Sequence, residues 1–312
     1  MDSARPSWSE HVVDGLAPSV AERLADSMSV VSVPAFASAA ECEALLCDAT
    51  AVAEGVRSGR VASERAGTLS ATLACRLEQP SMPSCVPGRV RLPVAGLAAG
   101  TQALCSQLLL RALDLVEKEL PATTGELFGS GFVAELHASS EPLGAASTQL
   151  KFTHNEPAIN VYDVGGEFSP HKDLQSLTVL VPLVGAESHE GGGTAFWPRR
   201  LAAEAVTSDV KPTLVLRPPA GTALLFGGEL THAGLPVTAG HRAVLVASFS
   251  RRCAPAHEGC ADGSCASCDA AAAGVPVASG DDGAASLDED SGGARRSLER
   301  ALLEQLYGPE VT

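Results

Sequence analysis

From residue 131 to residue 252 the chain is a series of short apolar runs separated by glycine and proline, and this pattern constrains the fold more than any other feature. Such runs are typical of strands in an all-β sandwich. Eight segments fit the pattern: residues 132–138, 158–164, 176–184, 194–197, 213–217, 222–226, 230–235 and 243–250. Eight antiparallel strands in two sheets predict a jelly roll, which can enclose a cofactor between its sheets.

Helical patterns precede these strands. After a short expected strand over residues 30–36, Ser38 and Glu41 form a capping box, and the apolar residues that follow recur at helical spacing. A second helix is expected over residues 101–119, with Pro121 ending it. The sequence therefore predicts an α+β chain with a mainly β core, a jelly roll with N-terminal supporting helices. Residues 57–93 hold several prolines and no period, so we expect an irregular loop that could act as a lid.

The same patterns divide the chain into four parts. Residues 1–27 lack a sustained period and are expected to be an arm or a frayed helix. Residues 28–252 form the predicted domain, with the jelly-roll core at about residues 130–252. Residues 253–294 are rich in alanine, glycine, serine and aspartate, which is typical of a solvated linker, and residues 295–312 could form a last helix. Four cysteines and one histidine open the linker: Cys253, His257, Cys260, Cys265 and Cys268. Only Cys265 and Cys268 have a spacing familiar from zinc sites. We therefore expect reduced cysteines in an irregular coil rather than a metal site.

Net charge, hydropathy and cysteine content limit the classes of partner and the compartment that fit this chain. The formal net charge of −15 disfavours a nucleic-acid partner, because a basic footprint is missing. The first residues lack the apolar stretch of a signal peptide, and no apolar run is long enough for a membrane span. Nine cysteines, an odd number, suit a reducing compartment better than a disulfide framework. The default expectation is a cytoplasmic protein, although an organellar transit peptide is not excluded.

Three residues have the chemistry of a metal site. His171 and Asp173 are two positions apart, so in extended backbone both side chains point to one face. Taken alone, this pair equally fits a surface salt bridge. His232 lies on a later expected strand, and two histidines with one carboxylate make a facial triad that leaves coordination positions open. This arrangement favours iron(II) over zinc, which prefers four closed ligands.

Three further residues suggest a clamp for a cosubstrate. Arg242 follows His232 by ten positions, at the start of an expected strand, where its guanidinium could grip a carboxylate with two hydrogen bonds. Tyr162 and Asn160 share one face of the strand expected before His171. Singly, they fit an exposed arginine and half-buried strand residues equally well. The remaining residues near the motifs are expected to be polar loop residues or core: His154, His189, His241, Phe196 and Trp197.

The motif around the first histidine has a recognisable form. The segment from Glu156 to Asp173, EPAINVYDVGGEFSPHKD, resembles the 2-oxoglutarate and iron(II)-dependent dioxygenases of the prolyl 4-hydroxylase type. The later segments GGGTAF (191–196) and PPAGTALLF (218–226) match the same pattern. The resemblance extends over about residues 30–252. It implies a double-stranded β-helix with Fe(II) on His171, Asp173 and His232, and with 2-oxoglutarate anchored at its far carboxylate.

The resemblance also implies a reaction. Such an enzyme uses O₂ and 2-oxoglutarate to hydroxylate a substrate C–H bond, releases succinate and CO₂, and commonly depends on ascorbate to restore the iron. The substrate could be a prolyl or other amino-acid side chain, in a peptide or free. Collagen-type prolyl hydroxylases usually carry lysine where this chain has Arg242, whereas intracellular oxygen-sensing relatives and many other members of the family carry arginine. A small-molecule or nucleobase oxygenase with the same iron centre and a non-catalytic binding barrel stay open as alternatives. The oligomeric state is not predicted.

Overall fold

A large sheet runs through the centre of the computed structural model, which describes residues 8–15, 17, 19–61, 64–65, 82–139, 141–207 and 209–252. Its strand order is β1-β2-β13-β9-β16-β7-β5-β4-β3, and β6 pairs with β16 off this path. The strands are β1 (Ser9–Val12), β2 (Ser29–Val33), β3 (Glu64–Arg65), β4 (Ser84–Val86), β5 (Arg89–Pro93), β6 (Leu150–Phe152), β7 (Ala158–Tyr162), β9 (Leu177–Pro182), β13 (Ala223–Phe226) and β16 (Arg242–Arg251). All neighbours are antiparallel except β3 and β4.

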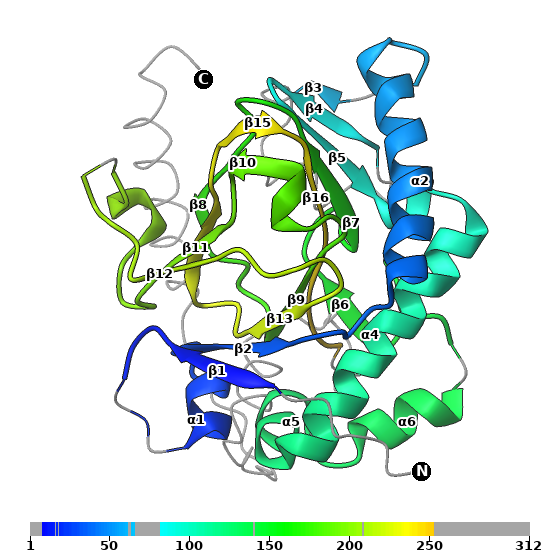
Figure 1. Ribbon diagram of the computed structural model, residues 1–312. Coiled ribbons are helices and arrows are strands. Elements are labelled where there is room, and N and C mark those ends of the chain that lie inside the picture. The colour runs from blue at the N-terminus through cyan, green and yellow to red at the C-terminus, as the bar shows by residue number, and fades with distance from the viewer. Residues whose placement is uncertain are drawn as a thin grey trace, which may run out of the picture. The chain divides into compact units, whose positions relative to one another are not determined.

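A second sheet has the strand order β12-β11-β14-β8. Along the chain, its strands alternate with strands of the large sheet. Its members are β8 (Phe168–His171), β11 (Thr194–Trp197), β12 (Leu214–Leu216) and β14 (Thr231–Gly234), and β10 (His189–Gly191) pairs with β15 (Val237–Gly240). From β7 onward the chain passes repeatedly from one sheet to the other (Figure 1). This alternation makes a double-stranded β-helix, so the predicted jelly roll is confirmed.

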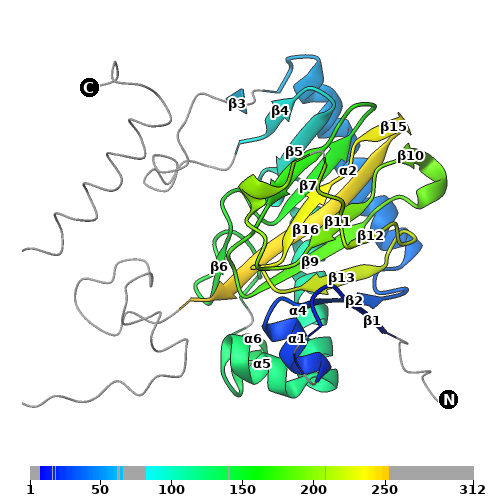
Figure 2. The ribbon, with the colours of Figure 1, turned by 90° about the vertical axis from the view of Figure 1, so that its left-hand side faces the viewer.

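Side-chain alternation assigns the two faces of the large sheet. On β16, Leu245 and Phe249 belong to the core shared with the helices, whereas Val244 belongs to the core between the sheets. The helices α2 (Ala39–Arg57) and α4 (Ala99–Glu119) lie along the outer face of this sheet (Figure 1). Figure 2, turned by 90° from that view, shows α1, α5 and α6 grouped at one end of the sheets. The inner face is therefore left to line a site between the sheets.

Both predicted helices are confirmed, together with their local signals. Ser38 caps α2, and Glu41 at its third position completes the capping box. Pro121 stands at the first turn of α5 (Pro121–Phe128), so the helix ending at residue 119 is followed directly by another. Phe196 and Trp197 are buried, as expected of core residues.

The expectation of a strand over residues 132–138 is wrong. The segment is helix α6 (Phe132–Ser139), and its buried residues are Phe132, Val133 and Leu136. This spacing fits one face of a helix, whereas a half-buried strand would bury alternate residues. The apolar composition was right, but the period was misjudged because the segment is short.

Two segments expected to be irregular contribute to the domain. In the expected arm, Ser9–Val12 forms β1 at the edge of the large sheet, and Leu24 in helix α1 (Val20–Ala25) is fully buried. In the expected lid, β4 and β5 extend the same sheet. Val90 and Leu92 are buried, and Arg89 and Arg91 between and beside them are partly buried. In both segments the strand forms because a neighbouring strand supplies its hydrogen bonds, which local sequence does not reveal.

The described residues all belong to one compact unit, Met1–Ala273. Among them, no helix is long and apolar enough to cross a membrane. The predicted linker over 253–294, its cysteine cluster and the predicted helix over 295–312 lie outside the described residues.

Candidate metal centre

His171, Asp173 and His232 bring their side chains together at the inner face of the second sheet. His171 ends β8 and stands directly opposite His232 on β14. Each of the three residues offers one ligand atom, and these atoms lie within 4.8 Å of one another. His171 Nε2 is 3.4 Å from Asp173 Oδ1, and His232 Nε2 is 3.5 Å from Asp173 Oδ2. Two imidazole nitrogens and a carboxylate oxygen thus converge on one point.

Backbone carbonyls fix the orientation of both imidazole rings. The Nδ1 atom of His171 lies 2.8 Å from the carbonyl oxygen of Ser169, and that of His232 lies 3.0 Å from the carbonyl oxygen of Leu230. Since a carbonyl can only accept, each Nδ1 carries a proton, so the neutral form of each ring has its lone pair on Nε2. A metal-binding histidine characteristically has this arrangement, because the outer hydrogen bond sets the tautomer.

The turn after β8 holds Asp173 in place. The backbone N–H groups of Asp173 and Leu174 both donate to the carbonyl of Gly228, at 3.0 Å each. Residue 228 must be glycine, because a Cβ there would lie 2.1 Å from the carbonyl oxygen of Gln175. Between the two ligands, Lys172 points away and donates to the carbonyl of Arg199. The alternation expected from the His-x-Asp spacing is therefore present.

Burial sets the protonation of the cluster. Burial lowers the pKa of His232 to about 4, so its ring is neutral at physiological pH. Burial raises the pKa of Asp173, but His232, His171 and the hydroxyl of Thr178 together lower it by more. The net shift of the Asp173 pKa is therefore downward. A neutral imidazole and an ionised carboxylate are the forms that ligate a metal.

Arg242 lies on the opposite wall, on the large sheet, directly across from Tyr162. Its side chain is 4% exposed, and its guanidinium carbon is 5.1 Å from the centre of the Tyr162 ring. Nη2 donates to Thr194 Oγ1 at 3.0 Å, whereas Nη1 is buried without a hydrogen-bond partner among the described residues. Burial lowers the pKa of Arg242, which reflects the cost of an uncompensated cation.

All six residues predicted from the sequence line one cavity between the sheets, of about 30 Å³. Asn160 is buried on β7, directly opposite Val244 on β16. Its amide oxygen is 3.4 Å from Arg91 Nη1, so its contact here is with a side chain that the sequence did not assign to the site. His154, His189 and His241 do not line this cavity.

Glu156, Arg91 and Phe168 line the same cavity but were not predicted as site residues. Arg91 donates to Glu156 at 2.6 Å, and Glu156 also accepts from the backbone of Ser248. Burial raises the pKa of Glu156 in spite of the arginine beside it. Phe168 packs against the His171 ring at 4.5 Å. The alternation of arginine with apolar residues in Arg89-Val-Arg-Leu92 indicates a strand whose arginines share one face. The prolines on either side of this segment obscured that pattern.

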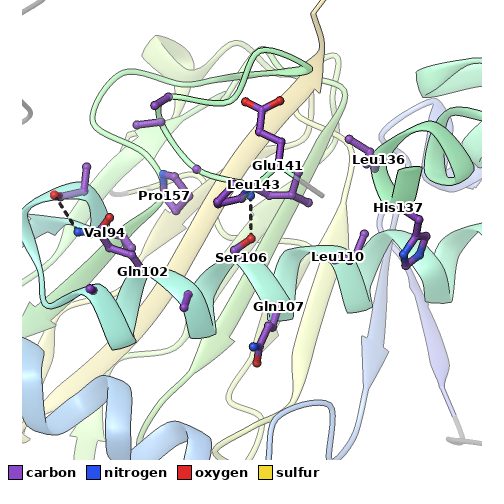
Figure 3. Close-up of a pocket in the computed structure, with 17 residues that line it drawn as sticks. Val94, Gln102, Ser106, Gln107, Leu110, Leu136, His137, Glu141, Leu143 and Pro157 are labelled. Atoms are coloured by element: carbon purple, nitrogen blue, oxygen red, sulfur yellow. Dashed lines mark hydrogen bonds between the residues drawn. The ribbon is translucent and has the colours of Figure 1, made fainter. Parts of the chain in front are cut away.

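A larger cavity, of about 760 Å³, lies on the other side of the large sheet, against the helices. Figure 3 shows that α4, α6 and the loop after α6 supply its side chains, with Ser106 accepting a hydrogen bond from the backbone of Leu143. None of the six predicted residues lines it. The chemistry-bearing residues thus gather in the small cavity between the sheets.

No protein-family model matches the sequence, and no curated protein matches it. Solved structures with a similar fold include two prolyl hydroxylases and an epimerase. The viral collagen prolyl hydroxylase of Paramecium bursaria Chlorella virus-1, in its 2OG complex, is 15% identical, with 73% of this chain and 98% of that chain covered and a TM-score of 0.36. A Pseudomonas putida prolyl-4-hydroxylase is 17% identical, with coverages of 80% and 95% and a TM-score of 0.37. The non-heme alpha ketoglutarate dependent epimerase SnoN from nogalamycin biosynthesis is 16% identical, with coverages of 75% and 83% and a TM-score of 0.41. At such low identities and TM-scores, function has to be inferred from this chain's own residues.

Proposed function

We propose that the protein is an Fe(II)- and 2-oxoglutarate-dependent dioxygenase that hydroxylates a C–H bond of an amino-acid side chain, with release of succinate and CO₂. One observation carries the proposal. Two imidazoles with fixed tautomers and one buried carboxylate converge on a point, and a buried, unpartnered arginine nitrogen lies in the same cavity. A metal and an anionic cosubstrate would satisfy both features at once.

The donor set fits iron(II). A histidine pair with one carboxylate, leaving coordination positions open, is the arrangement of non-haem Fe(II) oxygenases. A structural zinc site would need a fourth protein ligand, and no other described histidine, cysteine or acidic residue joins the cluster. Bound there, Fe(II) would supply the activation of O₂, which protein side chains alone do not provide.

The opposite wall fits a carboxylate. Nη1 of Arg242 lacks a partner among the described residues, and Thr194 lies beside it to complete a polar anchor. Leu180 and Val244 line the cavity between the two walls, which suits the methylene chain of a dicarboxylate. Since the cavity is smaller than this ligand, the side chains around it would have to move outward on binding.

The chain's own residues have separable roles. His171, Asp173 and His232 would hold the iron, and Arg242 with Thr194 would orient the cosubstrate from its far end. The aromatic rings of Phe226 and Phe196 pack around His232 and keep water away from this side of the site. Tyr162 supports the guanidinium with the face of its ring.

For the prime substrate, we propose a peptidyl or free amino-acid side chain, with proline as the first candidate. The support is the sequence resemblance to prolyl 4-hydroxylases and a net charge of −15, which repels phosphate chains. Ascorbate as the reductant that restores the iron stays a prediction of that resemblance.

The test is an anaerobic titration with Fe(II) and 2-oxoglutarate. Wild-type protein should develop a visible charge-transfer band only when both are present, and should release succinate with a panel of proline-rich peptides and amino acids. Alanine at residue 171, 173 or 232 should abolish both signals. The matched control is His137→Ala, since this exposed histidine pairs with Asp114 away from the site. Full signals in all three variants, or demethylated oligonucleotide as the sole product of a mixed panel, would contradict the proposal.

A further inference from the structure

Thr178 and Ser248 form a buried hydroxyl pair behind the proposed metal ligand Asp173. They stand directly opposite one another on β9 and β16, and both are fully buried. The neighbours of Thr178, Leu177 and Val179, belong to the core on the helix side. Alternation along the strand therefore turns Thr178 toward the site between the sheets.

The hydrogen bonds of this pair have a single possible direction. Thr178 Oγ1 lies 2.6 Å from Asp173 Oδ2 and 3.1 Å from Ser248 Oγ. An aspartate that ligates a metal is ionised and can only accept, so Thr178 must donate its one proton to it. Ser248 must then donate to Thr178. The resulting chain runs from Ser248 through Thr178 to Asp173, and its last bond is short because the acceptor is charged.

The two oxygens of Asp173 are consequently not equivalent. Each oxygen lies near one imidazole, Oδ1 at 3.4 Å from His171 Nε2 and Oδ2 at 3.5 Å from His232 Nε2. Oδ2 also accepts the hydrogen bond from Thr178, whereas Oδ1 accepts none from a described hydroxyl or backbone N–H group. The backbone on either side of this carboxylate is fixed as well, since the N–H of Asp173 donates to Gly228 and its carbonyl accepts from Thr153. Rotation of the carboxylate would have to break the bond to Thr178.

We propose that Thr178, supported by Ser248, is a positioning residue that keeps Asp173 a monodentate metal ligand through Oδ1. A carboxylate that bound through both oxygens would take up a coordination position that the cosubstrate or O₂ requires. The inference rests on the proposed function, because it presumes that a metal binds at the cluster. It extends that function by giving Thr178, which is not a metal ligand, the role of keeping coordination positions open.

The role of Thr178 can be tested by measuring metal affinity, without an activity assay. Co(II) binding is measured by calorimetry and by visible absorption in wild type, Thr178→Val and Thr178→Ser, without 2-oxoglutarate. Valine keeps the shape of threonine and removes the hydroxyl, so we expect affinity to fall about 10- to 100-fold, as for other outer partners of metal ligands. Its Co(II) band should also shift, because Asp173 is released to bind through both oxygens. Serine keeps the hydroxyl and should restore affinity and band. Thr123→Val is the matched control, a buried threonine on α5 that donates to the carbonyl of Ala21.

The outcomes separate the two proposals. Absence of Co(II) binding by wild type would overturn both. Tight binding by wild type with unchanged affinity and band in Thr178→Val would overturn this inference and leave the proposed function standing. Equal losses in the valine and serine variants would show that keeping the hydroxyl does not preserve metal binding, and would also overturn it. If the valine variant does not fold, Ser248→Ala replaces it. Removing the donor behind Thr178 should weaken Co(II) binding several-fold, and unchanged binding would refute the inference.

Discussion

Replacing Arg242 with methionine should weaken cosubstrate binding and at the same time stabilise the ligand-free protein. Arg242 is 4% exposed, and its Nη1 is buried with no partner among the described residues. It is therefore already desolvated, and a carboxylate that reaches it gains a charge-assisted hydrogen bond of about 1.5–3 kcal/mol. At about 1.4 kcal/mol for each factor of ten, the loss corresponds to a roughly 10- to 150-fold higher Kd for 2-oxoglutarate.

The sign of the stability change follows from the same geometry. A buried cation without a counter-ion is unfavourable, and burial lowers the pKa of Arg242 accordingly. Methionine has a similar length and no charge, so the free energy of unfolding without ligand should rise.

Calorimetric titration of 2-oxoglutarate into the anaerobic Mn(II)-loaded protein measures the first effect, and urea unfolding measures the second. Arg251→Met is the control, because Arg251 lies at the outer end of the same strand and contacts Glu135 and the carbonyl of Phe128. A Kd within twofold of wild type for Arg242→Met would refute the assignment of this residue as the carboxylate anchor. A fall in stability larger than that of the control would refute the view that its charge is uncompensated.

Two further predictions concern stability and one concerns pH. Removing one partner of the buried Arg91–Glu156 pair, as in Glu156→Ala, should reduce the free energy of unfolding by about 3–5 kcal/mol, measured in urea, and a smaller loss in the Arg91→Met, Glu156→Met double variant would confirm that the unpaired charge is responsible. Leu225→Ala, in the fully buried centre of β13, should reduce it by about 2–5 kcal/mol, whereas a change below about 1 kcal/mol would contradict the packing described. The hydrogen bond from Arg111 and the helix cap hold the pKa of Glu41 at about 2, below its ordinary 4.5. Its contribution is therefore fully present above about pH 4.5 and lost as the pH falls through about 2, so the stability difference between wild type and Glu41→Gln should shrink over this window in acid unfolding curves, and a constant difference would contradict it.

Local signals in the sequence predicted the elements whose stability depends on their own residues. The capping box at Ser38 and Glu41 marked the start of α2, and the apolar runs marked β7, β9, β11, β13 and β16. The short segment from Phe132 to Ser139 was misassigned, since its few apolar residues fit either period until tertiary contacts select one.

The sequence by itself determined the character of the site, because the spacing of His171 and Asp173 on extended backbone places two ligands on one face, and a histidine on a later strand can join them from a neighbouring position. Only the tertiary structure decided which distant residues meet that face. The cross-strand pairing of β5 with β7 places Arg91 opposite Asn160 and within reach of Glu156. The pairing of β9 with β16 brings Ser248 to Thr178 and hence to Asp173. Such pairings depend on strand order and register, which are set by how two sheets and their covering helices bury apolar surface together, and no local window of the sequence records that balance.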